Sequence, residues 1–62
     1  MKIKTFIKGG NFSQYQHFVI MVRSQYGLEP LGGGSPKDIA KRFGEYKIER
    51  VAIFQNIVRV EV

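Results

Sequence analysis

Hydrophobic and polar positions alternate through the first eight residues. Ile3, Thr5 and Ile7 recur at every second position, which is the spacing of one face of a β-strand. Gly9-Gly10-Asn11 follows and favours a tight turn, because these residues tolerate positive φ angles. The pattern predicts a half-buried strand over residues 1–8 with three lysines and one aromatic ring facing water. These outward residues are Lys2, Lys4, Phe6 and Lys8.

The next apolar segment supports two interpretations. Residues 18–22 form a continuous apolar run rich in β-branched side chains, as in a central strand. In a helix, Ser13 and Gln16 would instead form a capping box, but part of the apolar run would face away from the core. The run slightly favours a strand over 17–24 and leaves a helix at 13–26 open.

Glycine and proline interrupt residues 27–35, which the sequence predicts to be a loop. Ser35 then has the side chain of a helix N-cap, and Pro36 stands in the first turn, where its missing N–H costs no hydrogen bond. A short apolar stripe follows, and Gly44 closes the helix. These signals predict a helix over 36–43.

Two short alternating runs occupy the last eighteen positions, with Gln55-Asn56 between them as a tight connection. Together the elements predict one α+β domain over residues 1–62. It would contain a small three- or four-stranded, mostly antiparallel sheet with the 36–43 helix packed on one face. The predicted core consists of Ile3, Ile7, Phe18, Ile20, Val22, Ile39, Phe43, Val51, Ile53, Val58 and Val60.

Length and composition exclude several classes of protein. A chain of 62 residues buries only about 60% of its unfolded surface, so its fold has little stability to spare. The absence of cysteine excludes disulfides and thiolate chemistry, and it fits a reducing compartment, so we expect a cytoplasmic protein. No apolar run approaches the ~18–20 residues that cross a bilayer, and the first residues lack the apolar region of a signal peptide.

No arrangement of residues in the sequence indicates catalysis. The carboxylates fall in loops, caps or outward strand positions, and His17 has no Cys, His or Asp beside it to form a ligand set or a triad. The glycines before Ser35 lead into a helix N-terminus, a geometry that can bind an anion, but they match neither the Walker nor the dinucleotide pattern. We therefore expect no enzyme, no metal and no cofactor.

A formal net charge of +5 favours an anionic partner. Lysines hold phosphates and exposed aromatic faces stack on bases, so the sequence predicts a non-catalytic, weakly sequence-selective nucleic-acid-binding module with Phe6 as the stacking ring. Tyr15, Tyr26 and Tyr46 offer further rings, whose direction the sequence does not fix. Solvated charges and protection of an edge strand are simpler explanations of the same lysines. The predicted contacts are Lys2, Lys4, Phe6, Lys8, Lys37, Lys41, Arg42 and Lys47.

Residues 37–44, Lys-Asp-Ile-Ala-Lys-Arg-Phe-Gly, resemble the first helix and turn of helix-turn-helix regulators. The resemblance implies a recognition helix over 46–55, with Lys47, Glu49 and Arg50 facing DNA. The β-branched and aromatic residues of that same segment favour strands instead.

An interaction module is the alternative function. The apolar run in the first half of the chain exceeds what one short helix covers, and small domains without disulfides often gain stability by self-association or docking. The sequence therefore also supports a homodimer or a protein partner bound through Phe18, Ile20 and Met21, with no nucleic-acid role. By analogy, such an interaction module would resemble the small basic α+β proteins with which phages and mobile elements inhibit host proteins.

Overall fold

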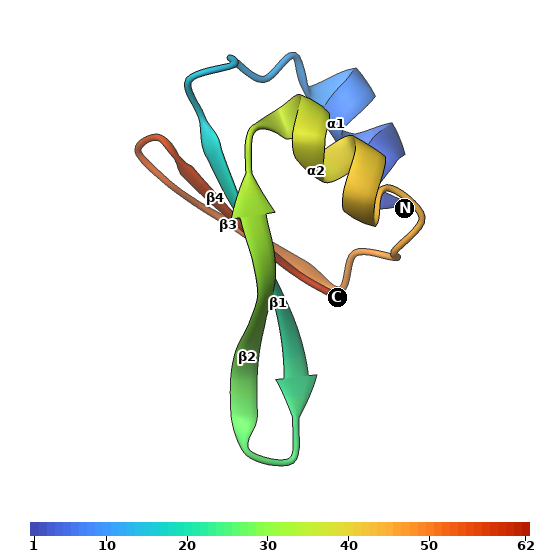
Figure 1. Cartoon of the computed structure of the whole chain (residues 1–62), viewed down its shortest axis with the longest axis vertical. Coiled ribbons are helices and arrows are strands. Elements are labelled where there is room, and N and C mark those ends of the chain that lie inside the picture. Colours follow the sequence, from blue (N-terminus) through green and yellow to red (C-terminus); the bar gives the residue numbers. More distant parts are fainter.

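Two β-hairpins and two eight-residue helices make up the fold (Figure 1). The computed structural model describes every residue from Met1 to Val62. The elements in chain order are α1 (Ile3–Gly10), β1 (His17–Ser24), β2 (Gly27–Gly34), α2 (Pro36–Phe43), β3 (Arg50–Phe54) and β4 (Ile57–Glu61).

The four strands form one sheet in the order β2-β1-β4-β3. Each hairpin is antiparallel, and the two central strands, β1 and β4, run parallel to each other. The α+β class and the mostly antiparallel four-stranded sheet are thus confirmed. In Figure 1, α1 and α2 lie side by side near one end of the sheet, and the β1–β2 hairpin extends away from them.

Residues 3–10 form a helix, so the predicted strand over 1–8 is wrong. The apolar positions fit the two-residue period of a strand and also the 3.6-residue period of a helix, because Ile3, Phe6 and Ile7 share one helical face. The first turn has no side-chain cap at Lys2.

The loop after α2 supplies the missing acceptors for the start of α1. Ile3 N donates to Tyr46 O at 2.9 Å, and Lys4 N donates to Gly44 O at 3.0 Å. Free N–H groups in a first turn need such acceptors. The helical conformation of the N-terminal segment is therefore stabilised by contacts far away in sequence.

The strand interpretation of 17–24 is confirmed, and the helix at 13–26 is wrong. The capping signal nevertheless corresponds to real hydrogen bonds. Ser13 N donates to Gln16 Oε1 at 2.9 Å, and Gln16 N donates to Ser13 O at 3.0 Å. These bonds close a single turn that leads the chain into β1.

The predicted loop over 27–35 is also wrong, since Gly27–Gly34 pairs with β1 as strand β2. At position 32, glycine leaves room for side chains of α2. A Cβ added at Gly32 would lie 2.9 Å from both Phe43 Cζ and Arg42 Nη2, so a side chain there would displace the ends of these two α2 side chains.

The helix over 36–43 is confirmed at both ends, with Asp38 N donating to the Ser35 hydroxyl at 3.3 Å. Gly44 closes the helix as expected, in a right-handed conformation with a φ of −59°, so the freedom of glycine to adopt positive φ is not used. Its lack of a side chain matters for another reason, because an added Cβ would lie 3.0 Å from Lys4 Cβ. Gly44 therefore lets α1 approach the end of α2.

The C-terminal hairpin is confirmed, with Gln55 in the connecting turn at a φ of 55°. Because Arg50–Phe54 is strand β3, the recognition helix implied by the helix-turn-helix resemblance does not exist.

The core lies between the helices and one face of the sheet. Most predicted core positions are buried or packed against it, but Ile53 is 57% exposed, since no helix covers that end of β3, and Val22 is only half-buried. The fully buried residues are Ile3, Phe18, Ile20, Ile39, Val58 and Val60.

Candidate nucleic-acid interface

The charged residues divide unequally between the two sides of the molecule. We define the helical layer as residues 1–10 and 35–48, which contain both helices and the loop after α2. This layer holds seven cations and two carboxylates, so its net charge is +5, equal to that of the whole chain. The rest of the molecule carries three arginines and three glutamates and is neutral. The cations of the helical layer are Lys2, Lys4, Lys8, Lys37, Lys41, Arg42 and Lys47.

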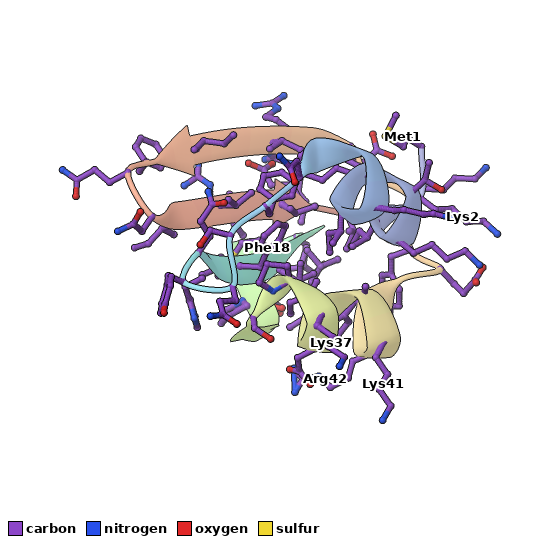
Figure 2. The ribbon with its side chains drawn as sticks, turned by 90° about the horizontal axis from the view of Figure 1, so that it is seen from above. Met1, Lys2, Phe18, Lys37, Lys41 and Arg42 are labelled. Atoms are coloured by element: carbon purple, nitrogen blue, oxygen red, sulfur yellow. The ribbon has the colours of Figure 1, made fainter.

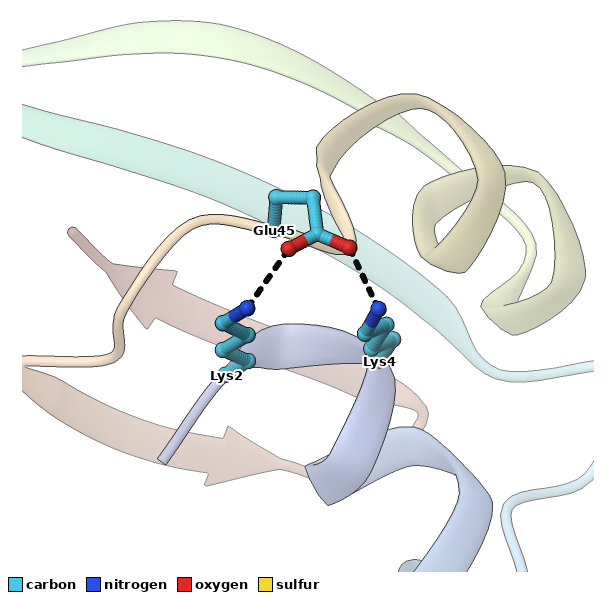
Figure 3. A network of polar contacts seen from close by, with 3 residues as sticks. All are labelled: Lys2, Lys4 and Glu45. Atoms are coloured by element: carbon cyan, nitrogen blue, oxygen red, sulfur yellow. Dashed lines mark hydrogen bonds and ion pairs between the residues drawn. The ribbon is translucent and has the colours of Figure 1, made fainter.

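Glu45 joins two of these lysines at the start of α1 (Figure 3). Lys2 Nζ donates to Oε2 of Glu45 at 2.7 Å, and Lys4 Nζ donates to Oε1. Hydrogen bonds from Lys2 and Lys4, together with their positive charge, lower the pKa of Glu45 from 4.5 to about 2. Lys47 pairs with Lys2 through the backbone, so a third lysine belongs to this corner, although only Lys2 and Lys4 contact the carboxylate.

The outer side of α2 presents a second group of cations. Lys37 and Lys41 are exposed one turn apart and make no ion pair. Figure 2 shows Lys41 projecting from α2 away from the sheet. The free lysines can reach a phosphate at little cost, because no internal contact has to be broken first.

Arg42 differs from these lysines because it is held in place. Its Nε lies 3.6 Å from Asp38 Oδ2, its Nη2 donates to Gly33 O at 3.5 Å, and its guanidinium lies 4.9 Å from the ring centroid of Phe43. Arg42 therefore contributes positive potential to the helical layer, but its geometry is already used in attaching α2 to β2.

Phe6 does not face water between lysines. Its ring packs on Phe12 with the centroids 5.1 Å apart, and Phe12 packs edge-on against Phe18 at 5.0 Å. A helix separates neighbouring residues by about 100°, so Lys4 and Lys8 share one face while Phe6 lies on the core side. The predicted basic and aromatic stripe of a first strand is wrong, and Phe6 is removed from the candidate contacts.

The predicted partner surface also fails. Phe18 and Ile20 are fully buried in the core, and Met21 lies on the opposite face of the sheet, because successive strand residues alternate. No partner can contact these three residues together without unfolding the domain.

The exposed ring of Tyr15, whose direction the sequence does not fix, lies beside the helical layer. A hollow of about 420 Å³ separates the turn before β1 from the start of α2. Tyr15 borders it with its side chain 80% exposed, and Lys37 borders it from the other side. Only the folded chain brings this ring and this ammonium group together. The hollow is lined by Phe12, Gln14, Tyr15, Ser35, Pro36 and Lys37.

On the face of the sheet away from the helices, two arginines, Arg23 and Arg59, pair with one carboxylate. Glu61 is 6% exposed, and its oxygens lie 3.6 Å from Arg23 Nη2 and 3.8 Å from Arg59 Nη2. The Arg59 guanidinium also lies 5.8 Å from the ring centroid of Phe54. These cations compensate a buried charge, so they are weaker candidates for a phosphate than the free lysines.

Comparison with protein-family models, with curated proteins and with solved structures gave no match. No three His, Cys, Asp or Glu side chains are grouped so as to hold a metal ion. Neither helix has the length and apolar character needed to cross a membrane.

Proposed function

We propose that this chain is a non-catalytic module that binds nucleic acid with weak sequence selectivity through the lysines of the helical layer. The observation that carries the proposal is the separation of charge, with the whole +5 on one layer and a neutral remainder. Lysines on a common surface bind phosphates by releasing condensed counterions, which needs no particular base sequence. A reducing compartment such as the cytoplasm suits a protein without cysteine.

Tyr15 favours single-stranded over duplex nucleic acid as the ligand. Its exposed ring borders a hollow that also contains Lys37. An unpaired base can stack on such a ring while a neighbouring phosphate meets the ammonium group, whereas bases in a duplex are already stacked. Two other tyrosines are exposed. Tyr46 is 45% exposed within the helical layer, but its ring packs edge-on against Phe43 with the centroids 5.8 Å apart. Tyr26 lies in the turn of the β1–β2 hairpin, which contains no lysine.

Two double variants with equal net charge test the role of the layer. Lys37→Gln with Lys41→Gln removes two charges from α2. Gln25→Glu with Asn56→Asp lowers the net charge equally, but in the two hairpin turns. Binding of a labelled oligonucleotide is titrated at several salt concentrations. The lysine variant should reduce the slope of log K against log salt by up to about 1.4, at about 0.7 per phosphate contact of a single strand.

The turn variant should leave that slope almost unchanged, because its added charges lie outside the helical layer. Absence of binding at low salt would overturn the proposed function. An equal loss in both double variants would also overturn it, since net charge alone would then explain the binding.

Tyr15→Ala and Tyr26→Ala form a matched pair for the stacking contact. Tyr15→Ala should cost about 1–3 kcal/mol of binding to a single strand, as removal of a stacking ring does, and should change duplex binding little. Tyr26→Ala should change neither. Equal effects of the two variants would remove Tyr15 from the site.

A further inference from the structure

The two edges of the sheet differ in how well they are protected. On β2, Pro30 has no N–H to offer, the Gly33 carbonyl accepts from Arg42, and the pairing with β1 shifts register between Ile20 and Met21. Proline, a bulge and side-chain cover are the means by which edge strands avoid pairing with other chains. The β2 edge is therefore blocked.

The β3 edge has none of these features. No hydrogen bond outside the β3–β4 ladder involves the backbone of Arg50–Phe54, and the strand contains neither proline nor lysine. Three large apolar side chains at this end of the hairpin are exposed: Ile53 at 57%, Phe54 at 58% and Ile57 at 47%. An edge with free backbone groups and apolar side chains is a template for another strand.

We propose that β3 pairs antiparallel with β3 of a second copy of this chain, across a two-fold axis at Ala52. The order Arg-Val-Ala-Ile-Phe is complementary to itself in this register. Val51 lies opposite Ile53 of the second copy, and Arg50 lies opposite its Phe54. The first pair is apolar, and the second sets a guanidinium against an aromatic ring, so both are favourable cross-strand pairs.

Charge also supports a second copy as the occupant. Arg50 is the only charged residue of β3, and this register places the two copies of Arg50 at opposite ends of the interface. The half of the molecule that would meet its partner is neutral, whereas the helical layer carries the whole net charge. Two copies can therefore associate through β3 without bringing their basic layers into direct contact.

The pairing joins two four-stranded sheets into one of eight strands. Val51 and the second copy's Ile53 both lie on the helix-covered face, so the two helical layers face the same side of the joined sheet. This arrangement does not depend on nucleic-acid binding and is tested without it.

The first test compares the mass in solution of the wild type, Ile53→Lys and Leu31→Lys. Both variants add one lysine to an exposed edge position, but Leu31 belongs to the blocked β2 edge. The mass is measured by light scattering at rising concentrations up to about 1 mM, where even a weak dimer with a dissociation constant near 1 mM is about half formed. The mass of the wild type and of Leu31→Lys should rise with concentration from the 7.1 kDa of the monomer toward twice that value. Ile53→Lys should stay at the monomer mass, with circular dichroism confirming that it folds. A monomeric wild type, or a dimeric Ile53→Lys, would overturn the proposal.

The second test uses the absence of cysteine in the chain. In the proposed register, the two copies of Ala52 face each other with Cα atoms about 4.5–5.5 Å apart, within the range that a disulfide spans. Ala52→Cys should therefore form a covalent dimer on mild oxidation, and Leu31→Cys should remain largely monomeric. Equal cross-linking of the two variants, or none in Ala52→Cys, would contradict the β3 interface.

Discussion

Glu45 holds two lysines together, so its charge acts on the stability of the fold. Its pKa is lowered to about 2 by Lys2 and Lys4, so the ionised form favours the folded state. This contribution is present above the ordinary pKa of 4.5 and is lost as the pH falls through about 2. Glu45→Gln should therefore lower the midpoint of urea unfolding slightly at pH 7, because exposed pairs contribute little.

The matched control is Glu29→Gln, an exposed carboxylate of β2 that makes no ion pair. It should leave the midpoint at pH 7 unchanged. Below about pH 2, Glu45→Gln and the wild type should unfold at the same urea concentration. A difference that persists unchanged at both pH values would mean that the Glu45 charge is not its cause.

The same substitution should have the opposite effect on nucleic-acid binding. The Glu45 carboxylate neutralises part of the charge of Lys2 and Lys4, and a phosphate has to compete with it. Glu45→Gln frees both ammonium groups, so affinity for an oligonucleotide should rise at low salt and the rise should shrink as salt screens the charges. Weaker binding by this variant would exclude Lys2 and Lys4 from the interface.

Gly44 and Gly9 distinguish a glycine needed for packing from one that is not. A Cβ at Gly44 would crowd Lys4 and the Ala40 carbonyl, whereas a Cβ at Gly9 would meet nothing within 4 Å. Gly44→Ala should destabilise the fold by about 1–3 kcal/mol, as overpacking does. Gly9→Ala should be neutral or stabilising by up to about 1 kcal/mol, since Gly9 lies within α1. Chemical denaturation of the two variants provides the comparison, and equal effects would contradict the close approach of α1 and α2.

At the scale of elements, the stacked rings of Phe6, Phe12 and Phe18 connect α1 to β1. Phe12 is the middle ring and is half-buried against the core. Phe12→Ala should destabilise the fold by about 2–3 kcal/mol, somewhat less than a fully buried phenylalanine, a large loss for so small a domain. Tyr15→Ala, three residues away and exposed, should change the free energy of unfolding little. A similar loss in both variants would show that Phe12 has no special part in attaching α1.

Elements with an unambiguous local signal could be predicted from the sequence. The helix over 36–43 has a serine cap and a proline in its first turn. The β3–β4 hairpin has two alternating apolar runs, Val51 and Ile53 in β3 and Val58 and Val60 in β4. The segment over 3–10 satisfies both the strand and the helix period, so its conformation depends on acceptors in the loop after α2. Strand β2 was obscured by its glycines, one of which, Gly32, leaves room for the Arg42 and Phe43 side chains of α2.

The candidate site was predictable only as a set of charges. The lysines are visible in the sequence, but their position on one layer follows from the helical conformation of residues 3–10 and from the packing of α1 on α2. The same change of conformation moved Phe6 from the surface to the core side. Tyr15 acquired its place beside Lys37 because the turn before β1 lies next to the start of α2.

At the scale of the whole molecule, the basic layer and the β3 edge occupy different sides and can be altered independently. The helical layer has charge but few exposed apolar groups, and the end of the β3–β4 hairpin has exposed apolar groups but little net charge. Phosphate binding and strand pairing therefore need not compete for the same residues. A dimer joined through β3 would instead align two basic layers on one side of a single sheet.

This alignment predicts a length-dependent salt effect. On an oligonucleotide long enough to reach both layers, the dimer contacts about twice as many phosphates as one chain, so the slope of log K against log salt should be about twice that of the Ile53→Lys monomer. On an oligonucleotide of about 4–5 nucleotides, near the smallest site of a single-strand binder, the two slopes should agree. Leu31→Lys adds the same charge and should behave as the wild type on both lengths. Because Ile53→Lys adds a cation, a shallower slope on the long strand cannot arise from loss of charge, and equal slopes on that strand would show that the two layers do not act together.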